Sequence, residues 1–180
     1  MRGSDELLEG CRQGSLASFE RLYEEHGARM KSIALNLLGS AADAEDAVQD
    51  AFLKVYRGAA RFRGGAAFST WVYRILVNSC YDLMRRRRRR VEGPLPARIA
   101  LASQESDHPL RLSIEAALRR LDARERTAFL LCEVEGFSHR EAGEVLDVSE
   151  SASRALLFKA RRRLQQELRA SGAPVPEGAS

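Results

Sequence analysis

Apolar residues recur every three or four positions through most of the chain, which is the period of helices that bury one face. This period predicts helices in the N-terminal half over 5–12, 15–39, 43–57 and 68–85. It predicts further helices in the C-terminal half over 110–121, 122–136, 138–146 and 149–169. No stretch alternates apolar and polar residues as a half-buried strand would. The pattern therefore predicts an all-α fold.

The helical period stops between the two halves. Val91 to Pro109 holds three of the five prolines and shows no clear period, apart from a short helical turn considered over 99–102. We therefore expect two small helical domains, 1–90 and 111–170, joined by a flexible linker over 91–110 and followed by a disordered tail over 171–180. A flexible coil of ~19 residues spans roughly 25 Å on average, enough for the two domains to reach separate sites.

The clearest local signal is a pair of helices near the C-terminus. Ser138 and Glu141 form a capping box at the start of the first helix, and Ser149 has the right chemistry to cap the second. Gly143 suits a close helix crossing, and Asp147 in the turn can enter the left-handed region at some cost. A short helix, a three-residue turn and a longer basic helix are typical of a DNA-binding helix-turn-helix, although an ordinary helix pair would share the pattern.

The same period predicts which side chains are buried. In the helix over 15–39 the expected core begins with Leu16, Phe19, Leu22 and Tyr23, and Gly27 is a candidate bend. In the helix over 43–57 the expected buried stripe is Ala44, Ala47, Val48, Ala51, Phe52, Val55 and Tyr56. In the C-terminal half, Val134 is assigned to the core.

The opposite face of the helix over 43–57 carries Asp46, Gln49, Asp50 and a single apolar residue, Leu53. An exposed Leu beside acidic groups is a common surface feature. The same combination is typical of a docking surface for a basic partner helix. Spacing alone gives these two interpretations equal weight.

The helix over 68–85 carries aromatic, amide and guanidinium groups on one side: Tyr73, Arg74, Asn78, Tyr81 and Arg85. Such groups suit unstacked bases, since rings and guanidinium planes stack and amides read base edges. Six consecutive arginines, Arg85 to Arg90, follow, whereas 41–50 has four acidic residues and no basic one. The net charge is only +4, so its uneven distribution favours a nucleic-acid partner for one face; a solvated helix end is the alternative.

Other chemistry is scarce in the sequence. Cys11, Cys80 and Cys132 lie far apart and the three histidines are isolated, which predicts no disulfide, no metal site, no cofactor and a reducing cytoplasm; Cys80 and Cys132 are expected in the core. No P-loop, GxSxG or HExxH motif occurs, so the protein is not expected to be an enzyme. No segment approaches the ~20 apolar residues of a membrane span, and no signal segment is evident at the N-terminus, so membrane insertion is not expected.

Three segments resemble the extracytoplasmic-function (ECF) sigma factors, which are two-domain initiation factors of bacterial RNA polymerase. They are DAEDAVQDAFLKVYR (43–57), FRGGAAFSTWVYRILVNSCYDLMRRRRR (62–89) and LDARERTAFLLCEVEGFSHREAGEVL (121–146). The resemblance implies an initiation factor that directs promoter recognition and DNA melting at −10 and −35 elements in a stress or envelope response. A stand-alone helix-turn-helix regulator is the alternative, but it has no use for the acidic face over 43–50 or for a second helix that faces nucleic acid.

The resemblance also implies a partner for each face. The residues that would dock on the β′ clamp helices of core polymerase are Asp43, Asp46, Gln49, Asp50 and Leu53. Those that would contact −10 DNA, with a base-capture loop over 63–70, are Arg63, Phe68, Ser69, Thr70, Asn78, Tyr81 and Arg85, while Trp71 is expected in the core. The second domain would sit on the β flap and contact the −35 element through Ser151, Arg154, Ala155, Phe158, Lys159 and Arg162.

The recognition helix departs from the family's pattern over Ala152 to Leu157. Ala155 and Leu156 replace polar or basic groups that would reach DNA, and Ser153 replaces an apolar core residue. Apolar contact with thymine methyl groups is one way in which such a surface reads DNA. An anti-sigma protein is a further partner that the resemblance implies.

Overall fold

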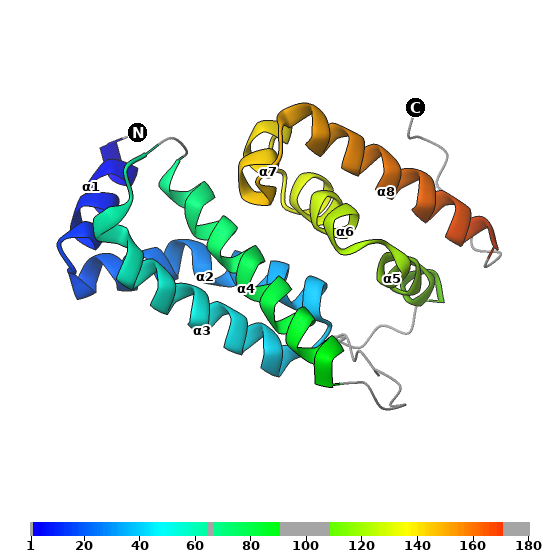
Figure 1. The fold of residues 1–180 in the computed structure, drawn as a ribbon, viewed down its shortest axis with the longest axis horizontal. Helices are drawn as coiled ribbons and strands as arrows, with labels where there is room; N and C mark the ends of the chain where they lie inside the picture. Colours follow the sequence, from blue (N-terminus) through cyan, green and yellow to red (C-terminus); the bar gives the residue numbers. More distant parts are fainter. Residues whose placement is uncertain (1, 65–66, 91–108, 171–180) are drawn as a thin grey trace. The chain divides into compact units, whose positions relative to one another are not determined.

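The structure, a computed structural model, describes residues 2–64, 67–90 and 109–170. Within these residues every regular element is a helix, which confirms the all-α prediction. The chain divides into two compact units, 1–102 and 103–180 (Figure 1). The first holds α1 (Arg2–Arg12), α2 (Leu16–Leu38), α3 (Ala41–Gly58), a 3₁₀ turn (Ala59–Arg61) and α4 (Phe68–Arg90). The second holds α5 (Pro109–Arg120), α6 (Ala123–Phe129), a π-helical turn (Leu130–Val134), α7 (His139–Leu146) and α8 (Glu150–Ala170).

Local chemistry sets the helix ends in the first unit. The Ser15 hydroxyl caps α2, and the Ser40 hydroxyl caps α3 by accepting a hydrogen bond from the Asp43 backbone N–H. Gly39 ends α2 at φ 67°, a left-handed value that glycine adopts without a Cβ clash. α2 continues through Gly27 without interruption. The predicted linker, the turn considered over 99–102 and the tail lie outside the described residues.

The core of the first unit forms where α2, α3 and α4 pack against one another. Ala44, Ala47 and Ala51 are fully buried, and such small side chains let α3 approach its neighbours closely. Around them lie the larger buried residues Leu22, Met30, Ile33, Leu37, Val55, Val72, Leu76 and Val77. α1 packs against α2 and buries Leu7 and Cys11.

Four burial predictions in this unit are wrong. Leu16, Tyr23 and Tyr56 were assigned to the core but are 71%, 58% and 56% exposed. Tyr73 was placed on the exposed side of α4 but is only 2% exposed, and its hydroxyl lies 3.0 Å from Nδ1 of His26. The helical period locates apolar positions along a helix, but it does not show which of them a neighbouring helix covers.

The second unit is built around α8, which packs against α5, α6 and α7. Its core contains Ala117, Leu121, Ala160, Leu164 and Leu168. The helix expected over 122–136 ends in the π-helical turn, and Val134 is 55% exposed there rather than in the core. A π turn holds more residues per turn than an α-helix, so it shifts the side chains that follow to a different direction. Cys132, in the same turn, is likewise only partly buried.

Candidate functional site

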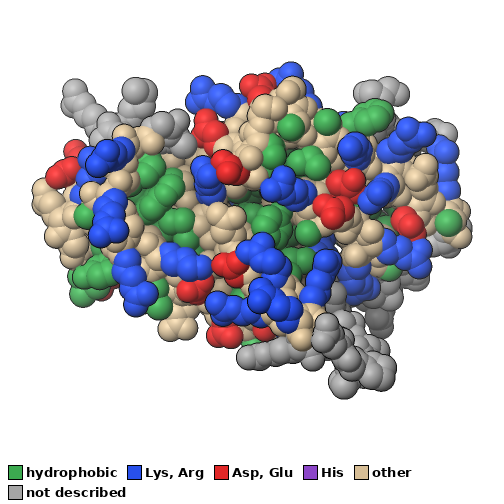
Figure 2. Space-filling model, viewed as in Figure 1, with side chains coloured by type: hydrophobic (Ala, Val, Ile, Leu, Met, Phe, Trp, Pro, Cys, Tyr) green, Lys and Arg blue, Asp and Glu red, His purple; other side chains and the backbone are tan. Residues whose placement is uncertain are grey.

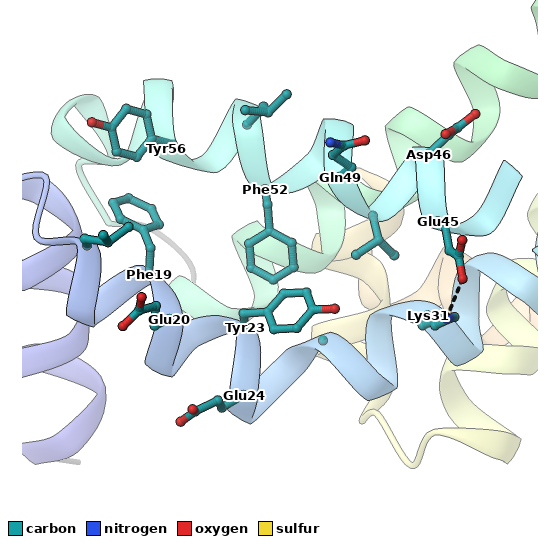
Figure 3. Close-up of a pocket in the computed structure, with 14 residues that line it drawn as sticks. Phe19, Glu20, Tyr23, Glu24, Lys31, Glu45, Asp46, Gln49, Phe52 and Tyr56 are labelled. Atoms are coloured by element: carbon teal, nitrogen blue, oxygen red, sulfur yellow. Dashed lines mark hydrogen bonds and ion pairs between the residues drawn. The ribbon is translucent and has the colours of Figure 1, made fainter. Parts of the chain in front are cut away.

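α2 and α3 form the two walls of an open groove with a volume of about 820 Å³ (Figure 3). Two aromatic pairs join the walls: the ring centroids of Phe19 and Tyr56 are 4.9 Å apart, and those of Tyr23 and Phe52 are 5.2 Å apart. Soluble proteins rarely leave aromatic side chains clustered on an open surface without an interaction that covers them. The groove is therefore a candidate protein interface.

Carboxylates surround this aromatic centre. The acidic residues that line the groove are Glu20, Glu24, Glu45 and Asp46. Among the described lining residues, Lys31 is the only cation, and its Nζ lies 2.7 Å from Oε1 of Glu45. This hydrogen bond lowers the pKa of Glu45 and raises that of Lys31, so both groups stay charged near neutral pH. The rim is negative overall and suits a basic partner.

The predicted polymerase-docking residues divide between two sides of α3. Asp46, Gln49 and Leu53 line the groove, and all three are exposed. Asp43 and Asp50 are not among the residues that line it. The structure therefore brings three of the five predicted residues into one surface.

The other two carboxylates are engaged by cations instead. Asp43 pairs with Arg87 of α4, and Asp50 lies 2.7 Å from Nζ of Lys54. The same ammonium group donates to the hydroxyl of Ser79 in α4 at 2.9 Å. Burial would raise the pKa of Asp50, but hydrogen bonds with Lys54 and Ser79 outweigh it and lower the pKa below its usual value. These two residues link α3 to α4.

The predicted −10 face of α4 is accessible at Asn78 and Arg85, and Tyr81 is partly buried. These three residues are spaced three and four apart, so they share one side of the helix. Arg85 to Arg89 are all exposed and place cations around this end of α4, and Figure 2 shows Lys and Arg side chains over it. Arg85 pairs with Asp82, one turn earlier.

Two predicted −10 residues lie in the interior. Phe68 is 7% exposed and Thr70 is 3% exposed. Phe68 forms an aromatic cluster with Phe62 and Trp71, whose ring centroids lie 5.0 to 5.6 Å apart. The side chains of Phe68 and Thr70 are therefore packed inside the first unit, and their contact with −10 DNA stays a prediction.

Two further predicted −10 residues remain accessible beside this cluster. Arg63 is exposed and Ser69 is half-buried. The guanidinium group of Arg12 in α1 donates a hydrogen bond to the Phe62 carbonyl oxygen at 2.5 Å. α1 thus holds the backbone immediately before Arg63.

α7 and α8 form the predicted helix-turn-helix. The Ser138 hydroxyl accepts a hydrogen bond from the Glu141 N–H, and the Glu141 carboxylate accepts one from the Ser138 N–H, which completes the capping box. Asp147 occupies the left-handed region at φ 57° and ψ 49°. A Cβ on Gly143 would lie 2.9 Å from the Val148 carbonyl oxygen, closer than carbon and oxygen can approach. The local predictions for this motif are confirmed.

α8 has one buried and one exposed face. The predicted −35 residues are all exposed and share the second face: Ser151, Arg154, Ala155, Phe158, Lys159 and Arg162. Phe158 is 67% exposed. Ser153 is fully buried on the opposite face, as expected for a position that the family's pattern gives to an apolar residue.

The sequence-based interpretation missed the α2 wall of the groove. Leu16, Phe19 and Tyr23 were read as one stripe with Leu22, yet they follow each other at intervals of three and four and form a stripe of their own. A helix that is apolar on two sides needs two partners. This second apolar stripe is the sequence pattern from which the α2 wall of the groove could have been predicted.

The described part of the chain shows little other site chemistry. Within it, no group of three His, Cys, Asp or Glu side chains is placed to hold a metal ion. Burial raises the pKa of the Cys80 thiol to about 12 and that of Cys11 to about 11, so both thiols stay protonated near neutral pH. No helix in the described ranges is long and apolar enough to span a bilayer.

Comparison with known proteins gives a consistent result. The chain matches the family models Sigma-70 region 2 over residues 22–90 and Sigma-70, region 4 over residues 111–164. It is 32% identical over 167 residues to the ECF RNA polymerase sigma factor SigM of Mycobacterium tuberculosis, covering 93% of this chain and 85% of that one. It is 29% identical over 177 residues to the ECF RNA polymerase sigma-E factor of Escherichia coli, covering 90% and 92%.

Two solved structures share the fold. CnrH, solved in complex with the cytosolic domain of CnrY, has a TM-score of 0.71 at 26% identity and covers 93% of this chain and 97% of its own. RpoE of Bartonella quintana, solved with the anti-sigma factor NepR, has a TM-score of 0.68 at 26% identity, with coverages of 86% and 98%. With its two sigma-70 regions and a SigM relative along most of its length, the chain belongs to the ECF RNA polymerase sigma factors and is a transcription initiation factor.

Proposed function

We propose that the first unit binds core RNA polymerase through the α2–α3 groove and opens the −10 element with α4, while α8 reads the −35 element. The groove is the observation that carries this proposal. Tyr23, Leu53 and Tyr56 expose apolar surface inside a rim of carboxylates. An apolar centre with a polar rim is the usual anatomy of a protein–protein interface.

The lining of the groove defines the partner's chemistry. An apolar, basic helical surface would cover Leu53 and the aromatic pairs while it neutralises Asp46 and Glu20. We assign this surface to the β′ clamp helices of core polymerase, with Gln49 as a hydrogen-bonding group between the charged and apolar contacts. The second unit would sit on the β flap, which leaves the exposed face of α8 free for DNA.

The α4 face would act on the unpaired strand at −10. Separating stacked bases costs a few kcal/mol, and stacking and charge contacts to the single strand offset this cost. Tyr81 supplies a ring, Asn78 an amide, and Arg85 a charge on one side of α4. No ATP is required in this scheme, and the chemical step belongs to polymerase, so we assign the chain no catalytic activity of its own.

Regulation would act on the same groove. The CnrH and RpoE structures were both solved with a partner, CnrY and the anti-sigma factor NepR respectively. We propose that an anti-sigma protein competes with polymerase for the α2–α3 groove. The chain would work in the bacterial cytoplasm, where polymerase and promoter DNA are found, in a stress or envelope response.

Size-exclusion co-elution with bacterial core RNA polymerase at moderate salt tests this proposal. We expect the full-length chain to co-elute at one-to-one stoichiometry. Asp46→Lys combined with Leu53→Ala should abolish co-elution, because it reverses a rim charge and removes an apolar contact at two exposed positions. A matched control, Glu6→Lys with Ile114→Ala, changes exposed residues outside the groove and should co-elute like the wild type.

Separate elution of a folded wild-type chain would contradict the proposal. It would favour a stand-alone helix-turn-helix regulator, which binds its duplex tightly without polymerase. Salt titrations of promoter-duplex binding with and without core enzyme distinguish the two, since a sigma factor needs core enzyme for tight binding.

A further inference from the structure

Lys54 lies between the helix that would dock on polymerase and the helix that would open the promoter. Its Nζ is 2.7 Å from Oδ2 of Asp50, one turn earlier on α3. On α4, it donates to the Ser79 hydroxyl at 2.9 Å and lies 3.8 Å from Oδ2 of Asp82. An ammonium group has three donor hydrogens, so these three oxygens can hold it in one place. Lys54 does not line the α2–α3 groove, and docking in the groove therefore does not explain this arrangement.

Asp82 has a different cation beside each of its two carboxylate oxygens. Oδ1 pairs with Arg85, three residues later on α4, whereas Oδ2 faces Lys54. Arg85 is three residues from Asp82 and four from Tyr81, so it lies where the side of α4 that faces α3 meets the side proposed for −10 DNA. In the free protein, a carboxylate of the same helix therefore holds the cation that is proposed for the promoter strand.

DNA binding changes the charges around Asp82. A phosphate that attracts Arg85 draws its guanidinium group away from Asp82 and leaves the carboxylate close to an anionic strand. Like charges a few ångströms apart repel, and this repulsion would oppose strand binding. Lys54 is already beside the other carboxylate oxygen, and Asp50 and Ser79 keep it there when Arg85 leaves.

We propose that Lys54 is a positioning residue for promoter opening: it neutralises Asp82 and so releases Arg85 to the unpaired −10 strand. Lys54 itself touches no DNA in this scheme. The inference rests on the proposed placement of α4 at −10. It adds that α3 contributes one side chain to promoter opening, besides its contacts with polymerase.

The same contacts would also allow Lys54 simply to join α3 to α4. That role depends on the buried Ser79, whose hydroxyl lies closer to the ammonium group than Asp82 does. Neutralisation depends on Asp82 instead. The two roles are separable, because removing the Ser79 hydroxyl should reproduce the effect of removing Lys54 in the first case and should leave DNA binding unchanged in the second.

The test uses holoenzyme assembled from the full-length chain and bacterial core polymerase. The probe is a promoter duplex that wild-type holoenzyme selects from a randomised pool, prepared with mismatched bases at −10 so that the strands are already separated. Lys54→Met removes the charge and should weaken binding of this probe about threefold, a size typical of one exposed charge contact. Lys54→Arg keeps the charge and should bind like the wild type. In the Asp82→Asn background, Lys54→Met should have no effect, because no carboxylate is left to neutralise.

Unchanged binding by Lys54→Met, or an equal loss in the wild-type and Asp82→Asn backgrounds, would overturn the inference. So would a threefold loss from Ser79→Ala alone, which would show that Lys54 acts by joining the two helices.

Arg85→Ala separates these results from the function on which the inference rests. It should weaken binding and reduce the slope of the salt dependence by about 0.7, the value for one phosphate of a single strand. Arg85→Ala holoenzyme that binds like the wild type would remove Arg85 from the −10 strand, and the proposed role of α4 would fail together with the inference. A loss from Arg85→Ala without one from Lys54→Met would overturn the inference alone.

Discussion

The α2–α3 groove and the exposed face of α8 both combine exposed aromatic side chains with charged groups, but the charges have opposite signs. Each exposes aromatic side chains, Tyr23 and Tyr56 in the groove and Phe158 on α8. Carboxylates surround the groove, whereas guanidinium and ammonium groups surround Phe158. Apolar contact supplies affinity without direction, and charge selects the partner and speeds the encounter. A chain of small net charge can therefore bind a basic protein surface through one face and anionic nucleic acid through another.

Shape adds a second difference between the two surfaces. Two helices wall the groove, so it is concave and can accept a helix from a partner. The α8 surface belongs to a single helix held by the helix-turn-helix, so it is convex and can enter a groove of another molecule. We expect variants that alter one surface to leave binding at the other unchanged.

The largest effect should come from Gly143→Val, which destabilises the helix-turn-helix that holds α8 and leaves the α2–α3 groove unchanged. Its side chain would meet the Val148 carbonyl oxygen, so the free energy of unfolding of the second unit should fall by about 3 kcal/mol. Urea denaturation measures this loss, with Ala116→Val on the exposed side of α5 as the control for the helix propensity of valine. Co-elution with core polymerase should persist, and loss of co-elution would show that the groove alone does not suffice.

Removing the groove's aromatic surface should have the next largest effect. Tyr23→Ala with Tyr56→Ala should weaken binding of core polymerase about thirtyfold, which is typical of hot-spot residues. Both side chains are more than half exposed, so the melting temperature should change little. Fluorescence titration of labelled protein measures the affinity. The double variant with Phe at both positions keeps the rings and should bind like the wild type; an equal loss in both variants would assign the effect to the hydroxyl groups.

A pH titration should show a smaller effect that is confined to the first unit. Burial lowers the pKa of His26, with Glu25 opposing and Arg29 adding to the shift, so the folded state binds this proton more weakly than the unfolded state. The stability linked to His26 is therefore full above pH about 6.5 and is lost as pH falls through the lower pKa of the folded state. The melting temperature should fall more between pH 7.5 and pH 5 in the wild type than in His26→Gln. Equal falls would exclude His26 as a source of acid sensitivity.

The smallest effect should come from Lys31→Ala, which increases the difference in charge between the acidic groove and the basic face of α8. It releases Glu45 from its ion pair and makes the groove more negative. Affinity for core polymerase should rise about twofold at low salt and return to the wild-type value at high salt, because exposed charges are screened. An increase that persists at high salt would point to a change in groove shape rather than charge.

Helix ends were predictable from the sequence because their chemistry is local. The hydroxyl groups of Ser40 and Ser138 each accept a hydrogen bond from the backbone N–H three residues later. Asp147 takes the left-handed conformation that the turn requires. The exposure of the proposed −35 residues agrees with the helical period, since α8 has a single buried side. These features involve contacts within one or two turns of the chain.

Burial between helices was less predictable. Tyr23 and Tyr56 were assigned to the core and instead line the groove, while Tyr73 lies in the core beside His26. Which of two apolar stripes is covered depends on how distant helices meet, and the spacing within one helix carries no information about that.

α1 also changes where the first unit can be cut. The Sigma-70 region 2 match begins at residue 22, after α1 has ended. Yet α1 contributes the buried Leu7 and Cys11, and its Arg12 supplies the donor for the Phe62 carbonyl. A fragment trimmed to the family boundary would lose apolar packing on α2 and leave that carbonyl without its donor, next to the segment that leads to Arg63. α1 therefore stabilises the first unit, and a domain prepared for promoter-opening studies must retain it.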